Sequence, residues 1–511
     1  MQRVFTAAQP LLPDIFDLHG RWRAGEPALV TDRGTLTWAA LTDKARRVAH
    51  GLRAAGLVPG DRVAVLMSNG DAFAVTLMGA MMAGVCSVPL NLSVDDAALA
   101  AMVRDAGARA VVITADQAGR LDPTGHLIAL VAEGAAAGFA DFEDWLADQP
   151  LPAQRPPVSP ETLLNIIYSS GTTGQPKGIA HTQQGRKDWA EDLALALRYH
   201  CGARTLITIG LYSNISWVAM LCTWICGGAI YVHKRFDAGA ALDAVERDRL
   251  THTAMVPLQF RGLLEAQADR PRDLGSMQAM MCCGSPLPVA DKQALVDIFP
   301  CGVIELYGLT EGIITTLEPE RVPDKIDTVG RPLPGCDLVI LDEADQPLAP
   351  GQAGEIAFTG RITMPGYWNR PEATAETSWT GPDGRVWLRS GDIGQVDSDG
   401  FLTIVDRKKD MILSGGQNIY PADIEAVLIT HPAVFSCAVI GVPDVKWGET
   451  PLALIEAPDA VDEAEVTAWL NARLGKQQRV RGVEIVAALP RNPNGKILKR
   501  ELRKQYGGGD V

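Results

Sequence analysis

The sequence predicts an α/β protein with a large N-terminal domain of βα-layered sheets, a β-rich subdomain and a small α+β C-terminal domain. Short apolar strands alternate with helical segments in the first third of the chain, and Pro- and Gly-rich turns alternate with short strands after Gly330. The stretch after Asp406 has helix and strand patterns of its own and is long enough for a separate lobe. We therefore expect domains at 1–406 and 407–511 within the 511 residues.

The first βα units follow from hydrophobic periodicity. Apolar residues recur with a helical period from Trp38 to Leu52, and Gly56 ends this segment. A buried strand is expected at 62–67, a second helix at 71–83 and another strand at 85–89. Because strands and helices alternate, they are expected to form a parallel sheet with helices on both faces.

Two later segments complete this outline. Residues 149–160 contain five prolines and predict a rigid connector before a strand at 163–167. Residues 206–232 carry no formal charge and are long enough to span a bilayer. Their Ser, Asn and Gly residues favour instead two short strands around a core helix at 216–226, so no membrane insertion is expected.

The composition is that of a globular protein and restricts its partners. The chain is 47% hydrophobic and 21% charged, and its formal net charge of −14 disfavours nucleic acid and anionic membranes as partners. Its nine cysteines include no Cys-x-x-Cys pair, so neither a disulfide framework nor a zinc cluster is indicated. The N-terminus lacks the apolar run of a targeting peptide, and a cytoplasmic location is expected.

A segment rich in Gly, Ser and Thr, residues 168–178, follows the strand at 163–167. Its glycines leave backbone N–H groups accessible to a phosphate, its hydroxyls add donors, and Lys177 adds a positive charge. A flexible polar turn has the same composition. Lys177 stands between Pro176 and Gly178, whereas a Walker loop ends in Gly-Lys-Ser/Thr, so a P-loop ATPase or kinase is disfavoured.

The segment from Tyr168 to Gly178 resembles the signature loop of the acyl-adenylate-forming superfamily, which includes acyl- and aryl-CoA ligases, firefly luciferases and the adenylation domains of peptide synthetases. Further segments match this superfamily in the expected order. Residues 306–311 match its Tyr-Gly-x-Thr-Glu motif, residues 390–392 and 406–407 its ribose-binding pair, and residues 492–497 its C-terminal Gly-Lys motif. Residues 366–374 are a softer match. The resemblance covers essentially the whole chain. It implies ATP-dependent activation of a carboxylic acid to an acyl-adenylate, release of pyrophosphate, and transfer of the acyl group to a thiol.

The resemblance also assigns roles at the nucleotide. The residues that would hold the β- and γ-phosphates are Ser169, Ser170, Gly171, Thr172, Thr173, Gly174 and Lys177. Glu311 would ligate Mg²⁺, a hard cation that prefers oxygen ligands, and Thr310 would contact the α-phosphate. The remaining assignments are adenine between Tyr307 and the turn of Gly284, Ser285 and Pro286, and ribose at Asp392 with help from Arg407.

Two lysines near the C-terminus receive roles from the same resemblance. Lys496 would bridge the carboxylate and the α-phosphate during adenylation, as a point charge placed where negative charge gathers. Taken alone, a lysine in a Gly/Asn turn is more often a solvated surface group. Lys409 matches the hinge about which the superfamily rotates its C-terminal domain, although it is also one member of an ordinary basic run.

The acyl pocket is less clearly marked. Ser213 stands where acyl- and aryl-CoA ligases carry a His, which puts the gating role of that His in doubt. The pocket candidates are Ser213, Asn214, Trp217, Gly308 and Ile313, and a buried strand-to-helix turn is the alternative for the first three. Residues 312–316 would form a largely apolar floor with no complement for a second charge, so we expect an uncharged aromatic, alicyclic or medium-chain acid.

CoA is the expected acceptor. Gly415 and Gly416 resemble the glycines that line the pantetheine channel of CoA ligases, and Trp447 is placed either near the CoA nucleotide or in lobe packing. No acidic residue in 206–232 could pair with an amino-acid substrate, and no carrier domain is expected after Lys496. Loading of a free-standing acyl-carrier protein, a luciferase-type activity and an ATP-binding regulatory role stay open. Homodimer formation is open as well.

Overall fold

The computed structural model describes residues 9–169, 177–414, 417–457, 461–476, 478–491 and 496–507. The chain forms two compact units. The first unit comprises the residues up to Ile326 together with Pro332–Asp337 and Thr359–Ser378. The second unit comprises Asp327–Arg331, Leu338–Phe358 and the residues from Trp379 onward. The predicted domain boundary between residues 406 and 407 stays a prediction.

One sheet of the first unit has a parallel core. Its strand order is β19-β9-β8-β4-β3-β5-β6-β7. The bounds are β3 (Arg62–Leu66), β4 (Cys86–Pro89), β5 (Ala108–Thr114), β6 (Ile128–Ala132), β7 (Ala140–Asp141), β8 (Leu163–Ser169), β9 (Lys177–Thr182) and β19 (Gly366–Tyr367). Strands β4, β3, β5, β6 and β7 run parallel, β8 joins them in parallel at β4, and β8 and β9 are antiparallel. The strands predicted at 62–67, 85–89 and 163–167 are thus confirmed to within two residues.

Helices α2 (Trp38–Ala54) and α3 (Asp71–Ala83) are the predicted N-terminal helices. Thr37 caps α2 by accepting a hydrogen bond from the backbone N–H of Ala40 at 3.3 Å. The two helices approach so closely that a Cβ atom on Gly79 would lie 2.4 Å from Cγ1 of Val48. The further helices of this half of the chain are α1 (Leu12–Trp22), α4 (Asp96–Ala106), α5 (Phe142–Ala147) and α6 (Gln183–Ala196).

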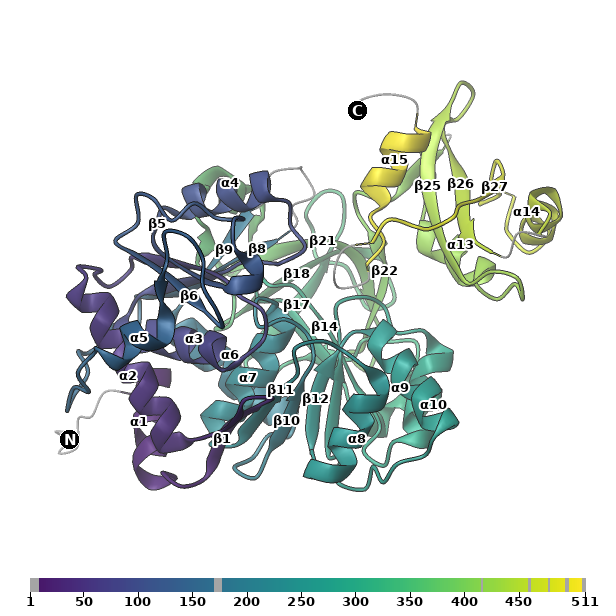
Figure 1. Cartoon of the computed structure of the whole chain (residues 1–511). Coiled ribbons are helices and arrows are strands. Elements are labelled where there is room, and N and C mark those ends of the chain that lie inside the picture. The colour runs from purple at the N-terminus through teal and green to yellow at the C-terminus, as the bar shows by residue number, and fades with distance from the viewer. Residues whose placement is uncertain are drawn as a thin grey trace, which may run out of the picture. The chain divides into compact units, whose positions relative to one another are not determined.

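A second sheet of the first unit contains the strand order β15-β14-β13-β12-β10-β11-β1-β2. Of these strands, β14, β12, β10, β11 and β1 are labelled in Figure 1. The bounds are β1 (Pro27–Thr31), β2 (Gly34–Thr37), β10 (Arg204–Ile207), β11 (Ala229–Val232), β12 (His252–Met255), β13 (Ala279–Cys282), β14 (Ile304–Gly308) and β15 (Ile314–Leu317). Leu206, Met255 and Met280 of this sheet share one apolar cluster with side chains of three helices. These helices are α8 (Ala238–Asp248), α9 (Pro257–Asp269) and α10 (Val289–Ile298).

The uncharged stretch 206–232 folds as predicted into strand, helix and strand. Helix α7 (Asn214–Cys226) connects the paired strands β10 and β11 along the chain. It ends at Gly227, whose φ of 85° lies in the left-handed region. Among the described residues, no helix combines the length and the apolar character that crossing a membrane requires. The two short helices that follow later in the chain are α11 (Val322–Lys325) and α12 (Pro371–Glu376).

The second unit is built on two sheets. The first has the order β17-β18-β21-β20 with β22 paired to β21, and the second has the order β24-β23-β26-β25 with β27 paired to β26. The bounds are β17 (Cys336–Leu341), β18 (Gly354–Gly360), β20 (Ser378–Thr380), β21 (Val386–Val396), β22 (Leu402–Arg407), β23 (Ile412–Ser414), β24 (Gln417–Ile419), β25 (Ser436–Asp444), β26 (Gly448–Glu456) and β27 (Val483–Ile485). Strand β16 (Arg331–Pro332) belongs to neither of these two sheets. This confirms the β-rich character predicted after Gly330.

Helices cover both faces of the β25–β26 hairpin (Figure 1). Ala438, Ile440 and Val442 pack with Leu502 of α15 (Lys499–Tyr506), whereas Val439 packs in a separate cluster on the other face. That cluster includes side chains of α13 (Pro421–Leu428) and α14 (Glu463–Asn471). Because successive strand residues point to opposite faces, an unbroken apolar run is expected for a strand buried on both sides. The mixed α/β class predicted for the chain is confirmed.

Candidate active site

Strands β8 and β9 form the hairpin that carries the predicted phosphate loop. Ser169 and Lys177 are register partners at the end of this hairpin from which the loop leaves and to which it returns. The predicted loop residues Ser170, Gly171, Thr172, Thr173 and Gly174 lie outside the described residues. Lys177 Nζ lies 5.0 Å from the ring centroid of Tyr367, a cation–π contact.

Tyr367 links the lysine to the predicted metal ligand. Its hydroxyl donates a hydrogen bond of 2.9 Å to Oε1 of Glu311. Burial, and then the charge of Glu311, raise the pKa of Tyr367 above its ordinary value, so it remains a donor. Lys177, Tyr367 and Glu311 therefore form one row, which we call the cation–tyrosine–carboxylate row. The segment 366–374 had been matched by its motif, but its composition gave no reason to assign Tyr367 this contact.

Thr310 and Glu311 lie at the tip of the β14–β15 hairpin. The backbone of Gly312, with φ of 111°, turns the chain there, and its N–H donates to the carbonyl of Leu309 at 3.0 Å. A Cβ atom at this position would lie 2.4 Å from the carbonyl oxygen of Ile362, so only glycine fits. The N–H of Met364 in turn donates to the carbonyl of Glu311 at 2.8 Å. The hairpin tip is thereby fixed against the residues that lead to Tyr367.

The chemistry of Glu311 fits a cation that arrives with its own oxygen ligands. Within the described part of the chain, no group of three or more His, Cys, Asp or Glu side chains is arranged to hold a metal ion. Mg²⁺ is commonly bound by one or two carboxylates together with substrate phosphates and water. A single carboxylate at the hairpin tip is therefore compatible with Mg²⁺ that enters with ATP.

The predicted adenine-binding residues lie at the carboxyl ends of two adjacent parallel strands. Tyr307 is in β14, and the turn of Gly284, Ser285 and Pro286 follows β13, with Cys282 and Glu305 as register partners. In open α/β sheets, ligands bind at this edge. The arrangement brings the two predicted sides of the adenine site to neighbouring strands.

A buried ion pair, together with one hydrogen bond, links these two strand ends. This pair was not predicted from the sequence. Lys292 Nζ lies 2.5 Å from Oε2 of Glu305, and Oε1 of Glu305 accepts a hydrogen bond from the N–H of Leu287 at 3.3 Å. Both charged side chains are buried. Burial raises the pKa of Glu305, while the Lys292 cation opposes that shift. Glu305 therefore connects β14 to the residue after the Gly284–Pro286 turn.

The predicted acyl-pocket residues lie where α7 begins and at the β14–β15 hairpin. Ser213 is the N-cap of α7, and its hydroxyl accepts from the N–H of Ile215 at 3.3 Å. Asn214 is half-buried, whereas Trp217 and Ile313 are fully buried. The indole N–H of Trp217 donates to the carbonyl of Leu211 at 3.0 Å, so the environment of this side chain is that of a core residue. Gly308 ends β14 and is exposed. A pocket role for these five residues stays a prediction.

In the second unit, Asp392 and Arg407 form the predicted ribose pair. They are register partners on the antiparallel strands β21 and β22, and Arg407 Nε lies 2.7 Å from Oδ1 of Asp392. The Asp392 side chain is buried, and its backbone N–H donates to the Ser390 hydroxyl at 2.9 Å. Ser390 donates onward to the carbonyl of Ile356 at 2.9 Å. Arg407 therefore holds the Asp392 carboxylate, and Ser390 holds the backbone of the same residue.

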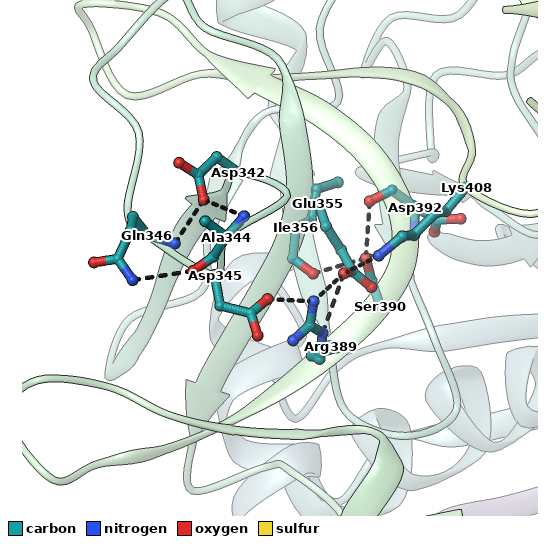
Figure 2. A network of polar contacts seen from close by, with 10 residues as sticks. All are labelled: Asp342, Ala344, Asp345, Gln346, Glu355, Ile356, Arg389, Ser390, Asp392 and Lys408. Carbon is teal, nitrogen blue, oxygen red and sulfur yellow. Dashed lines mark hydrogen bonds and ion pairs between the residues drawn. The ribbon is translucent and has the colours of Figure 1, made fainter. Parts of the chain in front are cut away.

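Lys409 occupies a turn between two anchored neighbours. Figure 2 shows Lys408 reaching the carboxylate of Glu355, with Nζ 2.9 Å from Oε2, and Arg389 bridging the same carboxylate and Asp345. On the other side, Asp410 Oδ1 pairs with Nη2 of Arg503 in α15 at 2.7 Å. The residue before Lys409 is tied to strand β18 and the residue after it to the C-terminal helix. This is the position that a hinge between those parts would occupy.

Lys496 and Trp447 are described, but the predicted CoA glycines, Gly415 and Gly416, lie outside the described residues. Burial, followed by the charge of Arg407, lowers the pKa of Lys496 to about 8. Asp392 also acts on this lysine in the opposite direction. Trp447 is 49% exposed in the turn between β25 and β26. Lys496 thus lies within electrostatic reach of the predicted ribose pair rather than on an isolated surface.

Comparison with known proteins identifies the family of the chain. The AMP-binding enzyme model matches residues 16–368, and the model of the AMP-binding enzyme C-terminal domain matches residues 423–496. A feruloyl-CoA synthase of Amycolatopsis sp is 36% identical over 483 residues, which cover 92% of this chain and 94% of that protein. The fatty acid–[acyl-carrier-protein] ligase ScoC of Streptomyces coeruleorubidus is 31% identical, with 99% of each chain covered.

Solved structures of AMP-binding enzymes are similar to this chain as well. The o-succinylbenzoate CoA synthetase of Bacillus subtilis, in complex with its acyl-adenylate intermediate, superposes with a TM-score of 0.85 at 28% identity. The match covers 98% of this chain and 99% of that one. The motifs in order, the mixed α/β architecture and these similarities lead to one conclusion. The chain belongs to the AMP-binding enzyme family and is a ligase of its acyl- and aryl-CoA synthetase group.

Proposed function

We propose that the chain converts an uncharged aromatic, alicyclic or medium-chain carboxylic acid to its acyl-adenylate and then transfers the acyl group to CoA. The observation that carries this proposal is the cation–tyrosine–carboxylate row of Lys177, Tyr367 and Glu311. Lys177 lies over the face of the Tyr367 ring, and the Glu311 carboxylate accepts from the hydroxyl of the same residue. In our proposal the lysine binds phosphate and the carboxylate binds Mg²⁺. A nucleoside triphosphate bound with Mg²⁺ requires both kinds of group, a cation for its phosphates and a carboxylate for its metal ion.

The chemistry requires activation because a carboxylate at neutral pH has no good leaving group. Its oxygen attacks the α-phosphorus of ATP, the bond to the β-phosphate oxygen breaks, and pyrophosphate departs with the electron pair. Catalysis of such a step rests mainly on positioning and on neutralising the charge that develops. Lys177 and the phosphate loop hold the departing phosphates in our proposal, and Thr310 contacts the α-phosphate.

Mg²⁺ that enters with ATP would be held by Glu311 and would neutralise phosphate charge as a Lewis acid. The Tyr367 hydroxyl fixes the orientation of this carboxylate by donating to one of its oxygens. Asp392, aligned by Ser390 and Arg407, would accept hydrogen bonds from the ribose hydroxyls. Tyr307 and the Gly284–Pro286 turn would enclose the adenine.

Lys496 is the proposed catalytic cation of adenylation. An ammonium group between the attacking carboxylate and the α-phosphate opposes the charge repulsion that otherwise separates them. The thiol step needs no such cation at that position, because the acyl group is already activated. Rotation about Lys409 is proposed to change, between the two steps, which residues of the C-terminal domain face the acyl-adenylate. Gly415, Gly416 and Trp447 are the proposed CoA-binding residues.

Substitution of Lys496 tests this role. We expect Lys496→Ala to lower the rate of acid-dependent pyrophosphate exchange by about 100- to 1000-fold, the typical cost of losing one preorganised electrostatic group. Thioester formation from a preformed acyl-adenylate should be largely retained. Equal loss of the two half-reactions would contradict the assignment.

Two properties of the sequence and its relatives support the choice of substrate. The predicted pocket floor is largely apolar, with Ile313 fully buried, and it carries no charged side chain to pair with a second charge. The similarity to a feruloyl-CoA synthase supports an aromatic acid, and the similarity to a fatty acid ligase supports an aliphatic one. The latter relative is an acyl-carrier-protein ligase, so a carrier protein is the second candidate acceptor.

A pyrophosphate-release assay decides between these alternatives. The enzyme is incubated with Mg·ATP and a panel of aromatic, alicyclic, medium-chain and dicarboxylic acids, with CoA, with a phosphopantetheinylated carrier protein, or with neither. We expect AMP and pyrophosphate with one uncharged class, and acyl-CoA when CoA is present. An acylated carrier without acyl-CoA would select the second acceptor, and no AMP from any acid would contradict the proposed function.

A further inference from the structure

Arg186 is a charged side chain in the core of the first unit. It lies on α6, has 0% exposed surface, and forms no ion pair with a described residue. Its guanidinium carbon lies 4.5 Å from the ring of Trp189 and 5.5 Å from that of Trp217. Burial lowers the pKa of Arg186 to about 9, so the side chain remains a cation at neutral pH.

The hydrogen bonds of this guanidinium lead to three separate segments. Nε donates to Oδ1 of Asn165 on β8 at 3.0 Å, and Nη2 donates to Oδ1 of Asn214 at 2.9 Å. The same Nη2 lies 3.3 Å from Nδ1 of His181 on β9. Nη1 is buried and finds no acceptor in the part of the chain that the structure describes. Burying this charge without a carboxylate is costly, so packing alone gives no reason for an arginine here.

His181 extends the network to the predicted nucleotide site. An arginine can only donate, so Nδ1 of His181 must accept, and the ring proton is assigned to Nε2. Nε2 lies 2.9 Å from the carbonyl oxygen of Thr310, to which it therefore donates. Burial, together with the nearby Arg186 charge, lowers the pKa of His181 well below its ordinary value, which keeps the ring neutral. The Arg186 donor and the Thr310 acceptor thus select the same tautomer, and Arg186 holds the ring that donates to the Thr310 backbone.

Asn214 extends the network in the other direction. Its amide oxygen accepts from Arg186, which directs the amide nitrogen, a donor, away from the guanidinium. Asn214 is the first residue of α7 and is half-buried, so this nitrogen belongs to the part of the side chain that ligands could approach. The amide would otherwise be able to present either its oxygen or its nitrogen.

We propose that Arg186 is a positioning residue that orients both the Thr310 backbone, through His181, and the amide of Asn214. This inference rests on the proposed function, because it takes Thr310 as a nucleotide contact and Asn214 as an acyl-pocket residue. Arg186 touches neither substrate in this proposal. It further follows that the pocket presents an N–H donor, so acids with a hydrogen-bond acceptor on the acyl group are favoured over their plain hydrocarbon analogues.

Steady-state kinetics of three single variants and their combination test the proposal. Arg186→Met should lower kcat/KM for ATP and raise the KM for the acid, each by about tenfold or more. The reason is that His181 and Asn214 each lose the charged hydrogen-bond donor that orients them. His181→Leu should reproduce only the loss for ATP, and Asn214→Ala only the rise in acid KM. The triple variant should be no worse than Arg186→Met, since residues in one network are not additive.

Arg198→Met is the matched control. Arg198 follows the same helix, but its exposed guanidinium pairs with Glu320 at 2.7 Å. We expect unchanged kinetic constants for this variant. Arg186→Lys keeps the charge without the branched geometry and should show intermediate losses, which serves if the methionine variant does not fold. Variants that lower only the unfolding temperature, or effects that add in the triple variant, would overturn the positioning role.

A measurement without turnover separates this inference from the proposed function. Nitrogen-15 chemical shifts of His181 in the nucleotide-free protein should show an unprotonated Nδ1 and a protonated Nε2. Arg186→Met should shift the Nδ1 resonance, because its lone pair loses the guanidinium donor, while Nε2 stays protonated against the Thr310 carbonyl. A protonated Nδ1 in the wild type would refute the network itself. Absence of AMP from the wild-type enzyme with every acid would instead refute the proposed function.

Discussion

At the scale of single residues, burial decides the state in which Lys496 works. Its pKa is lowered to about 8, whereas a solvated lysine stays charged well above that pH. The catalytic form in our proposal is the cation, which is present below the pKa and is lost above it. We therefore expect kcat/KM for acid-dependent pyrophosphate exchange to be level below pH 8 and to fall about tenfold per pH unit above it.

Bound ATP brings negative charge to this lysine and should raise its pKa. The break in kcat is therefore expected at a higher pH than the break in kcat/KM, since the two report the complex and the free enzyme. Lys496→Arg is the control, because an arginine keeps its proton throughout the range and should show no break near pH 8. A wild-type profile that stays level to pH 10 would exclude titration of Lys496 from the rate.

Tyr367 is the second residue whose chemistry can be tested alone. Tyr367→Phe keeps the ring under Lys177 but removes the hydroxyl that donates to Glu311. We expect the Mg²⁺ concentration for half-maximal activity to rise about tenfold, which is the usual effect of losing a hydrogen bond to a charged group. Tyr168→Phe is a matched control, because its hydroxyl donates to Asp105 at 2.7 Å and not to Glu311. Equal Mg²⁺ dependence in the two variants would remove Tyr367 from metal positioning.

At the scale of secondary-structure elements, the buried pair of Glu305 and Lys292 joins β14 to α10, and Glu305 also accepts from Leu287 after the Gly284–Pro286 turn. Glu305→Gln retains the shape but leaves the Lys292 cation without its counter-charge. Breaking a buried pair in this way typically costs about 3–5 kcal/mol, so we expect a clearly lower unfolding temperature. The KM for ATP should rise as well, because the Gly284–Pro286 turn loses an anchor through Leu287.

Thermal unfolding and ATP titration together check this prediction. Asp291→Asn is a suitable control, since Asp291 lies beside Lys292 on α10 and pairs with the exposed side chain of Arg261 on α9 at 2.7 Å. Exposed pairs contribute little to stability. An unfolding temperature of Glu305→Gln equal to that of the control would show that the buried pair does not hold the two elements together.

Elements that local patterns specify were predicted from the sequence. Helix α3 begins at Asp71 and ends before Gly84, as its apolar run and the glycine indicated, and the stretch 206–232 folded as strand, helix and strand. The site was predictable only where a motif is contiguous, as at Thr310 and Glu311. Arg186 and Tyr367 were not assigned their contacts, because their partners are distant in sequence and only the tertiary fold brings them together.

At the scale of the whole molecule, the hinge proposal concerns how one chain completes two reactions. Lys408 is bound to Glu355 and Asp410 to Arg503, so rotation of the C-terminal helix relative to β18 would have to use the backbone at residue 409. A hinge absorbs changes in φ and ψ without touching the chemistry. Lys409→Ala leaves that backbone freedom intact, whereas Lys409→Pro fixes φ near −65° and restricts Lys408 as well.

We therefore expect Lys409→Pro to slow thioester formation, measured from preformed acyl-adenylate and CoA, by about tenfold or more. Acid-dependent pyrophosphate exchange should change much less, because that step needs only one arrangement of the chain. Lys409→Ala should leave both half-reactions close to wild type. If the proline variant slowed pyrophosphate exchange as strongly as thioester formation, residue 409 would be a structural position, and the rotation would have to occur elsewhere in the chain.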